Sequence, residues 1–501
     1  MNLARLVTLG SLGLAALLIF LLAWKPAPAT GKRHSSTPLP SLLVYCAAAL
    51  KPAVEKAAHE FEAETGRRVQ IQFGGSGTLL SNLRIAKQGD LFIAADDFYL
   101  QAARSNQLVA ETIPLARMSP VLAVAKGNPK QIRNLEDLER GDVRLALPNP
   151  ETAAIGRLAR ERLMAQGRWQ SLSSRAVALK PTVNDLANDL KLGSADAAIV
   201  WDATVRQYPE LEAVPGEFLG SVESEISASV LAFSLQPAEA LQLARFLGSP
   251  QRGVPHFERF GFRGVEGDAW AVRPEIVVYS GGVNRLAIEE TLRRFEQREG
   301  VSISRVYNGC GLLTAQIRAG QKPDAYVACD VSFLQPVAGQ FHAGLELAET
   351  RMVIAVKPGN PMGLKTLSDL ARPGLKLGLA HEEQSALGAL SLRVLREQHL
   401  ADAVASNVVV RTPTADLLIN QLRAGALDAA LVYEANAKPA AAHMDFFVVD
   451  WPSAFAIQPV AVGRHTAYPR LMARLVQALA SPESQDRFVA QGFKWRRTPK
   501  P

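Results

Sequence analysis

Residues 42–79 read LLVYCAAALKPAVEKAAHEFEAETGRRVQIQFGGSGTL, and residues 276–313 read IVVYSGGVNRLAIEETLRRFEQREGVSISRVYNGCGLL. Each stretch begins with a short apolar run typical of a strand and continues through small residues into an amphipathic helix. A glycine then ends the helix, and a second strand leads to a glycine-rich loop. The order strand, helix, strand, loop, helix predicts a parallel, doubly wound sheet, so the fold class is α/β.

The similarity between these two stretches continues along nearly the whole chain. Six residues recur at one constant spacing, and the pairs are Tyr45/Tyr279, Phe61/Phe295, Gly66/Gly300, Gly77/Gly311, Asp90/Asp324 and Asp96/Asp330. Solenoid and propeller repeats are far shorter than this, so each copy should be a globular unit with its own core. We therefore expect one unit at residues 41–274, called repeat 1, and a second at residues 275–494, called repeat 2.

Each repeat is expected to contain two lobes. In repeat 1 the apolar run Pro120–Ala125 leads into a second α/β block with strands near Arg144–Leu147 and Ala197–Trp201. The chain then returns through another apolar strand near Ser227–Phe233. A sheet that the chain leaves and re-enters indicates two lobes joined by two crossing strands. Ligands of such sheets bind outside the carboxyl ends of the strands, so we expect a ligand cleft between the lobes.

The composition is that of folded domains. Of the 501 residues, 48% are hydrophobic and 21% are charged, which is ordinary for globular proteins. The net charge of +7 is spread thinly, and the basic tail at residues 495–501 is too short to suggest a nucleic-acid footprint. We expect no nucleic-acid partner.

Residues 1–40 contain an export signal and a linker that do not belong to the fold. An apolar run at Leu6–Trp24 follows Arg5 and precedes the small-residue pattern Ala27-Pro28-Ala29. The small residues favour a cleaved signal peptide, whereas the length of the apolar run favours a retained anchor in the inner membrane. Both alternatives place the repeats in the periplasm or another extracytoplasmic space.

The strongest chemical signal is a glycine loop between a strand and a helix, which both repeats contain. It reads Gly74-Gly75-Ser76-Gly77 in repeat 1 and Asn308-Gly309-Cys310-Gly311 in repeat 2. Glycines let the backbone approach a ligand closely, and the start of a helix offers unpaired N–H groups suited to an anion. The alternative is a tight turn that packs against its surroundings and binds no ligand. Because both repeats contain the loop, this alternative is less favourable.

Residues typical of catalysis are missing from the sequence. The chain has 8 His residues, and it lacks HExxH, CxxC and Gly-x-Ser-x-Gly motifs. A hydrolase built on Ser76 would need a histidine in a matching place in both repeats, and Ser76 itself becomes Cys310. We expect neither an enzyme nor a bound cofactor.

Four segments resemble the periplasmic molybdate-binding proteins of ABC importers, a branch of the type II solute-binding fold. They are Val44–Leu50, Phe73–Leu79, Asp90–Asp96 and Ala198–Trp201, and their copies extend the resemblance over both repeats. The resemblance implies two tandem type II periplasmic-binding-protein-like units. It also implies that a tetrahedral oxyanion is held between the lobes by neutral donors: two serine hydroxyls, two backbone N–H groups and a tyrosine hydroxyl.

The site that the resemblance implies is incomplete in both repeats. In repeat 1 it falls on Cys46, Ala49, Ser76, Gly77, Ile155, Val183 and Trp201. In repeat 2 it falls on Ser280, Val283, Cys310, Gly311, Leu387, Ala415 and Tyr433. The first serine is thus replaced by Ala49 and Val283, the second is kept only as Ser76, and the tyrosine is kept only as Tyr433. Each missing donor costs about 1.5–3 kcal/mol of binding free energy, so the two sites should differ.

The three cysteines, Cys46, Cys310 and Cys329, all fall near the expected mouth of a cleft. Cys46 is either a small buried apolar residue or part of the site. For Cys310 and Cys329, neighbouring parallel strands allow a disulfide in an oxidising compartment, and a site for a thiophilic metal or oxyanion is the alternative.

We therefore expect an extracytoplasmic binding protein for molybdate or tungstate that presents its ligand to the permease and ATPase subunits of an ABC transporter. A membrane-anchored sensor or scavenger with one degenerate repeat is the first alternative. Binding of another oxyanion or of a soft metal species is the second.

Overall fold

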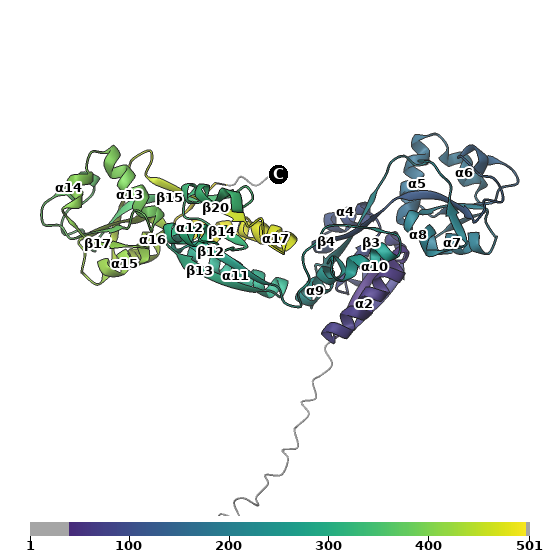
Figure 1. Ribbon diagram of the computed structural model, residues 1–501, viewed down its shortest axis with the longest axis horizontal. Coiled ribbons are helices and arrows are strands. Elements are labelled where there is room, and N and C mark those ends of the chain that lie inside the picture. The colour runs from purple at the N-terminus through teal and green to yellow at the C-terminus, as the bar shows by residue number, and fades with distance from the viewer. Residues whose placement is uncertain (1–39, 497–501) are drawn as a thin grey trace, which may run out of the picture. The chain divides into compact units, whose positions relative to one another are not determined.

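The computed structural model describes residues 40–496, and each repeat is described separately below (Figure 1). The predicted signal or anchor at residues 6–24 and residues 497–501 of the basic tail lie outside this range. Within residues 40–496, no helix is both long enough and apolar enough to cross a membrane.

The first lobe of repeat 1 contains a six-stranded sheet. In spatial order its strands are β11 (Arg263–Gly264), β4 (Val109–Met118), β10 (Ser224–Leu231), β3 (Leu91–Ala94), β1 (Leu42–Ala47) and β2 (Val69–Gly74). β1 pairs in parallel with β2 and β3, as predicted, whereas β10 pairs antiparallel with β3 and β4. The chain crosses from β1 to β2 through α2 (Lys51–Thr65) and returns to β3 through α3 (Ser76–Ala86). Because crossovers are right-handed, these two helices cover opposite faces of the sheet.

Helix α2 has the boundaries and the buried face that its sequence predicts. The side chains of Val54, Ala57 and Phe61 are buried at helical spacing. Gly66 ends the helix with a left-handed φ of 70°, and its N–H donates a hydrogen bond to the carbonyl oxygen of Glu62 at 2.8 Å. Gly300 ends the corresponding helix of repeat 2 in the same way, with a φ of 65°. A glycine suits both positions because a side chain is strained at positive φ.

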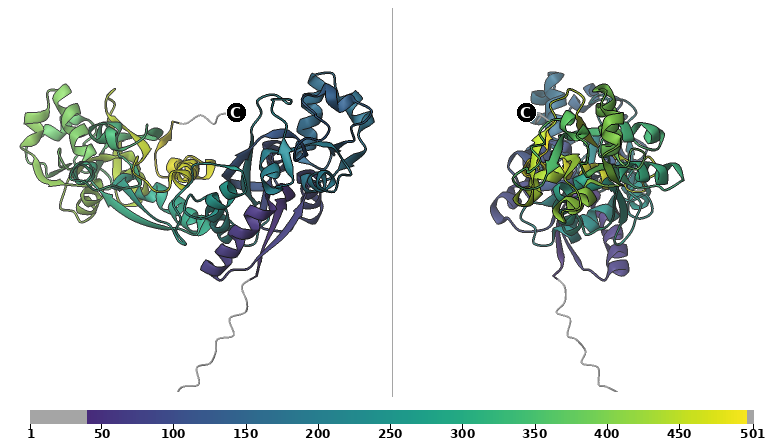
Figure 2. Two further views of the ribbon diagram at one scale, coloured as in Figure 1. Left: turned by 45° about the vertical axis from the view of Figure 1, so that its right-hand side comes forward. Right: turned by 90° about the vertical axis from the view of Figure 1, so that its left-hand side faces the viewer.

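The second lobe of repeat 1 contains a five-stranded sheet. Its strands in spatial order are β7 (Ala178–Lys180), β6 (Leu145–Pro148), β8 (Ala197–Trp201), β5 (Pro120–Ala125) and β9 (Leu211–Ala213). The remaining helices of repeat 1 are η1 (Ala48–Leu50), α4 (Asp97–Ser105), η2 (Glu136–Glu139), α5 (Ala154–Ala165), α6 (Trp169–Arg175), α7 (Val183–Lys191), α8 (Asp202–Gln207), α9 (Pro237–Leu247) and α10 (Gly253–Arg259). Figure 2 shows the same helices packed around the sheets from two further directions.

Repeat 2 repeats this plan, but its strands form one ten-stranded sheet. The main path is β13 (Ser302–Asn308), β12 (Glu275–Gly281), β14 (Ala325–Val327), β20 (Phe455–Val462), β15 (Leu345–Val356), β18 (Ala429–Tyr433), β16 (Leu377–Ala380) and β17 (Val408–Thr412). Two more strands, β19 (Asp445–Val448) and β21 (Lys494–Trp495), pair with β15. β21 shows that the first residue of the expected basic tail, Trp495, belongs to the sheet.

The helices of repeat 2 follow the order of those in repeat 1. They are η3 (Gly282–Asn284), α11 (Arg285–Glu299), α12 (Cys310–Arg318), η4 (Val331–Phe333), η5 (Gln335–Gln340), η6 (Leu367–Ala371), α13 (Ala386–Glu397), α14 (Ala401–Ala405), α15 (Ala415–Arg423), α16 (Glu434–Ala437), η7 (Lys438–His443), α17 (Pro469–Leu479) and α18 (Pro482–Ala490). The short 3-10 helices η4 and η5 stand where repeat 1 has the α-helix α4.

The connection between the lobes differs in the two repeats. In repeat 2 the strand β15 runs unbroken from one lobe to the other, pairing with β20 in the first and with β18 and β19 in the second. In repeat 1 the same segment is split into β4 and β5 at Ser119, directly before Pro120. Proline has no backbone N–H to donate across a sheet. The counterpart of Pro120 is Met352, whose N–H donates to the carbonyl oxygen of Ala454 at 2.8 Å.

Candidate functional site

Three helices of repeat 1 begin at one small cavity between its lobes. α3 comes from the first lobe, whereas α5 and α7 come from the second. The cavity measures about 20 Å³, room for about one water molecule. It is lined by Ala47, Ala48, Ala49, Gly74, Gly75, Ser76, Ala95, Ala153, Ala154, Ile155, Pro181, Thr182, Val183 and Trp201. No charged side chain belongs to this lining.

The donors around this cavity are those that suit an anion. Ser76 and Val183 are the first residues of α3 and α7, and Ile155 is the second residue of α5. N–H groups in the first turn of a helix have no acceptor within that helix, and they lie at its positive end. The Ser76 hydroxyl oxygen accepts a hydrogen bond from the N–H of Ala95 at 3.2 Å, which leaves the hydroxyl hydrogen available. Ser76, Ile155 and Val183, predicted from the sequence, therefore meet at one place.

The glycine loop brings the two lobes of repeat 1 into direct contact. The N–H of Gly77 donates to the carbonyl oxygen of Thr152 in the second lobe at 2.9 Å. A Cβ atom on Gly75 would lie 2.7 Å from the carbonyl oxygen of Pro181, so only glycine permits this approach. Gly77, expected to contact the ligand, thus uses its N–H between the lobes.

An ion pair also joins the lobes of repeat 1. The guanidinium of Arg157, on α5, donates to the carboxylate of Asp96 at 3.0 Å, and it lies 4.2 Å from the centre of the Phe98 ring. The side chains of Asp96 and Arg157 are only 6% and 19% exposed. Asp96 also caps α4 by accepting a hydrogen bond from the N–H of Phe98. The sequence analysis missed this interlobe pair, and repeat 2 has Ala389 in the place of Arg157.

The other residues predicted for the site of repeat 1 fall into two groups. Ala49 and Trp201 line the cavity, and the Trp201 side chain is buried where the resemblance implies a tyrosine. Cys46 is fully buried in the hydrophobic core, which is the first of the two alternatives given for it. Burial raises the pKa of the Cys46 thiol well above its ordinary value, so this side chain stays a neutral apolar residue.

The corresponding helices of repeat 2 begin close together between its lobes, in the place where we expect its ligand cleft. Cys310 and Ala415 are the first residues of α12 and α15, and Leu387 is the second residue of α13. The N–H of Gly311 donates to the carbonyl oxygen of Gln384 at 3.0 Å, matching the contact of Gly77. A Cβ atom on Gly309 would overlap carbonyl oxygens of Gln384 and Pro413, which lie just before α13 and α15. The backbone donors predicted for repeat 2 are therefore brought together as in repeat 1.

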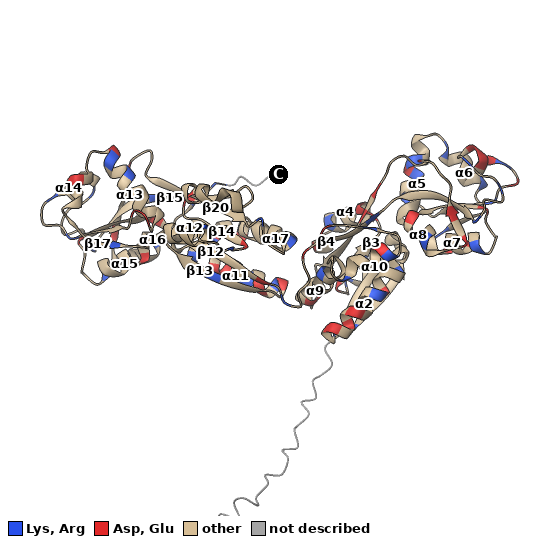
Figure 3. Cartoon of the chain, in the orientation of Figure 1, with Lys and Arg blue, Asp and Glu red and all other residues tan. Residues whose placement is uncertain are grey.

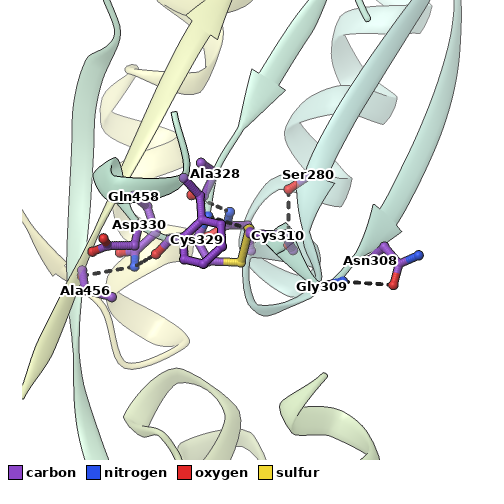
Figure 4. The surroundings of a disulfide bond; sticks show 12 residues. Ser280, Asn308, Gly309, Cys310, Ala328, Cys329, Asp330, Ala456 and Gln458 are labelled. Atoms are coloured by element: carbon purple, nitrogen blue, oxygen red, sulfur yellow. Dashed lines mark hydrogen bonds between the residues drawn. A yellow bond between two sulfur atoms is a disulfide. The ribbon is translucent and has the colours of Figure 1, made fainter. Parts of the chain in front are cut away.

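A disulfide joins Cys310 to Cys329 at this cleft, with a Cα–Cα distance of 6.2 Å. The N–H of Cys329 donates to the Cys310 sulfur at 3.0 Å (Figure 4). The side-chain amide of Gln458 donates to the carbonyl oxygen of Cys329 at 2.8 Å and fixes the turn that carries it. The disulfide alternative for these residues is confirmed, and no group of three or more His, Cys, Asp or Glu residues between 40 and 496 is arranged to hold a metal.

Tyr433 is the tyrosine that the resemblance implies for the site of repeat 2. It ends β18 at the position of Trp201, its side chain is 2% exposed, and its hydroxyl has no hydrogen-bond partner within residues 40–496. Burial, with a smaller contribution from the charge of Asp330, raises the pKa of Tyr433 well above its ordinary value. The phenol therefore stays neutral and keeps its hydrogen. A buried hydroxyl without a partner is costly, so this group points to a ligand that completes its hydrogen bond.

Two more polar residues of repeat 2 are Ser280, which was predicted, and Asp416. Ser280 is fully buried at the end of β12, and its hydroxyl donates to the carbonyl oxygen of Gly281 at 3.2 Å. Asp416, the second residue of α15, was not predicted; an added Cβ atom on Gly282 would lie 3.7 Å from its carboxylate. The carboxylate accepts a hydrogen bond from the Asn436 amide at 2.9 Å, and burial raises the pKa of Asp416.

Basic and acidic residues are interspersed over both repeats (Figure 3). Many of them pair on the surface, as Arg144 does with Asp196 in repeat 1 and Lys357 with Asp428 in repeat 2. Mixed surface charge of this kind does not single out a highly charged partner.

Comparison with known proteins identifies the kind of molecule that has these clefts. The family model described as bacterial extracellular solute-binding protein matches the chain twice, at residues 42–263 and 276–494. A candidate binding protein of Haemophilus influenzae is 33% identical over 224 residues, which is 44% of this chain and 90% of that protein. The molybdate-binding protein ModA of Mycobacterium bovis is 27% identical over 217 residues, or 41% of this chain and 81% of that protein.

Among solved structures, the periplasmic molybdate-binding protein of Azotobacter vinelandii is similar to one half of the chain. It covers 45% of this chain and all of its own length, with 19% sequence identity and a TM-score of 0.39.

Proposed function

Because the chain belongs to the bacterial extracellular solute-binding proteins, as two tandem type II units, we propose that it captures a small oxyanion, molybdate or tungstate first. We propose further that it works outside the cytoplasm and presents this ligand to the permease and ATPase subunits of an ABC transporter. Names of relatives support the choice of anion, since several are molybdate-binding proteins.

One observation carries the proposal: three helix N-termini converge between two lobes in each repeat. In repeat 1 they surround a cavity whose lining includes no charged side chain. Neutral N–H and hydroxyl donors at helix N-termini hold an anion without a counter-ion, and hydrogen bonds to a charged ligand are stronger than those between neutral groups. No catalytic step is part of the proposal.

Repeat 2 is the better candidate for the working site. Its Tyr433 hydroxyl is buried and has no partner within residues 40–496, whereas repeat 1 places Trp201 there. In addition, the lobes of repeat 1 are already joined by Arg157 and Asp96. The proposed primary ligand set of repeat 2 is the N–H groups of Cys310, Leu387 and Ala415 together with the hydroxyl of Tyr433.

The test is thermal unfolding of the full chain with molybdate, tungstate, sulfate and phosphate, each at several concentrations. A ligand that binds only the folded state raises the melting temperature as its concentration increases. We expect molybdate and tungstate to stabilise the protein more than sulfate or phosphate. Absence of stabilisation by all four anions at millimolar concentration would refute oxyanion binding.

A second candidate function, a sensor or scavenger that does not deliver its ligand, is favoured by the ion pair in repeat 1. An ion pair between the lobes favours closure, which suits a constant surface for a partner protein better than a cycle of ligand capture and release. The two functions are separated by adding the loaded protein to a reconstituted molybdate ABC transporter: delivery predicts stimulated ATP hydrolysis, and the sensor function predicts none.

A further inference from the structure

The Cys310–Cys329 disulfide occupies the position of the Ser76 hydroxyl of repeat 1. In repeat 1 the N–H of Ala95 donates to the Ser76 oxygen at 3.2 Å, and in repeat 2 the N–H of Cys329 donates to the Cys310 sulfur at 3.0 Å. Cys310 and Cys329 therefore replace Ser76 and Ala95 in the same local geometry. The covalent bond is added at the start of α12, where the proposed ligand of repeat 2 binds.

The residues around the disulfide leave room for its two sulfur atoms. A Cβ atom on Gly281 would overlap the Cys329 sulfur and lie 2.8 Å from the Cys310 sulfur. The counterpart of Gly281 in repeat 1 is Ala47, which faces no sulfur atom. Ala386, the first residue of α13, packs against both cysteines from the second lobe. The disulfide is thus part of the cleft wall.

The chemical form of Cys310 decides what the three helix N-termini can bind. As a disulfide, the sulfur is neutral and leaves the N–H groups to a ligand. After reduction, Cys310 is a thiol in the first turn of a helix, a position that stabilises the thiolate. A thiolate there would satisfy the same N–H groups and repel an oxyanion. Burial of Cys310 and the nearby carboxylates of Asp330 and Asp416 oppose this ionisation, so the thiolate forms mainly at alkaline pH.

We propose that the Cys310–Cys329 disulfide is a redox gate on the anion site of repeat 2: the oxidised form binds the oxyanion, and reduction by a dithiol expels it. The gate rests on the proposed function, because it regulates the same site. Ligand binding then depends on the thiol–disulfide state of the compartment as well as on the oxyanion concentration.

The reduction is an ordinary thiol–disulfide exchange. One thiolate of the dithiol attacks the sulfur of Cys329, which is 5% exposed while Cys310 is fully buried, and the S–S bond breaks to release Cys310 as a thiolate. The second thiol of the reductant then attacks the mixed disulfide and releases Cys329. Two electrons pass to the protein, the reductant becomes a disulfide, and its two protons go to Cys329 and to solvent.

Lobe closure and reduction should oppose each other. Both sulfurs are buried, and the contact between Gly311 and Gln384 holds the second lobe over them. The dithiol reaches Cys329 only when the lobes separate, so an anion that holds them closed slows reduction. Coupling between two events at one site is reciprocal, so the oxyanion protects the disulfide to the extent that reduction weakens its binding.

The experiment measures molybdate binding to the full chain by calorimetry at pH about 8.5, where an unperturbed cysteine thiol is half ionised. The oxidised protein is compared with protein reduced by dithiothreitol, and thiol titration verifies opening of the bond. The same measurement is made on the Tyr433→Phe variant. The molybdate binding that this substitution removes is assigned to the site of repeat 2. We expect its affinity to fall by roughly tenfold or more on reduction, and molybdate to slow the reduction itself.

The matched control is the double variant Cys310→Ser with Cys329→Ala, which restores the residues of repeat 1 and cannot form a thiolate. Its affinity for molybdate should not respond to dithiothreitol. Equal affinity of the oxidised and reduced proteins, with both thiols verified, would overturn the gate while leaving the proposed function intact. Failure of molybdate to bind in either redox state and in the double variant would overturn both.

Discussion

At the scale of single residues, Tyr433 should carry much of the binding. Replacing it by phenylalanine removes one hydrogen bond to a charged ligand, worth about 1.5–3 kcal/mol. We expect Tyr433→Phe to weaken molybdate binding by about ten- to a hundredfold in equilibrium dialysis. Because its hydroxyl has no partner within residues 40–496, the protein itself should lose no stability.

Tyr326→Phe is the matched control for that substitution. Tyr326 is also fully buried in repeat 2, but it lies in a separate hydrophobic cluster and its hydroxyl faces Thr314 at 3.5 Å. This variant should bind molybdate like the unaltered chain. If both variants bind normally, Tyr433 does not contact the ligand.

Asp416 should act against binding. Its carboxyl group lies near the cleft of repeat 2, where an oxyanion raises the cost of ionising it. The counterpart in repeat 1 is Asn184. We expect Asp416→Asn to tighten molybdate binding severalfold at neutral pH, with a smaller gain at acidic pH, where the carboxyl is already protonated. Unchanged affinity at both pH values would place Asp416 too far from the anion to matter.

The sequence allowed some site residues to be predicted and concealed others for a physical reason. Ser76 follows from the glycine loop, which is visible in the sequence, whereas Ile155 and Val183 were located through the resemblance to molybdate-binding proteins. Arg157 could not be predicted, because its pairing with Asp96 depends on how closely the lobes approach. For Cys46 the sequence left two alternatives open, because β1 is buried on both of its faces.

At the scale of elements, the contact of α5 with the first lobe should set how firmly repeat 1 is closed. Arg157→Ala removes one partner of a largely buried ion pair, and such losses cost about 3 kcal/mol or more. We expect lower stability in urea unfolding and faster hydrogen exchange at the start of α3, where Gly77 meets Thr152.

Arg160→Ala, on the same helix, is the control. Arg160 pairs with Glu151 at 2.7 Å, but the side chains are 39% and 76% exposed, so this pair should contribute less than about 1 kcal/mol. Equal effects of the two substitutions would show that the interlobe pair does not hold repeat 1 closed.

The elements themselves were largely predictable, because strands and helices of a doubly wound sheet differ in the period of their apolar residues. The stops at Gly66 and Gly300 were also visible. The continuity of β15 could not be predicted, since the sequence pattern of an apolar strand is the same whether or not the strand passes between lobes. The one local sign was Pro120, which breaks the same strand in repeat 1 and becomes Met352 in repeat 2.

At the scale of the whole molecule, the two repeats share a fold, but only repeat 2 should bind the oxyanion. The cavity of repeat 1 has room for about one water, it contains Trp201, and its lobes are joined by an ion pair. We expect one molybdate per chain at saturation by calorimetry, and we expect Ser76→Ala to leave that stoichiometry unchanged. A stoichiometry of two would show that repeat 1 opens and binds as well.

Gly281 makes room for the disulfide of repeat 2. A Cβ atom on residue 281 would overlap the Cys329 sulfur, so the bridge in its present position requires glycine there. Repeat 1 has Ala47 at this position. Grafting cysteines at positions 76 and 95 should therefore yield a disulfide only when Ala47 is also changed to glycine. The two repeats thus differ by a single methyl group at the position that decides whether the disulfide can form.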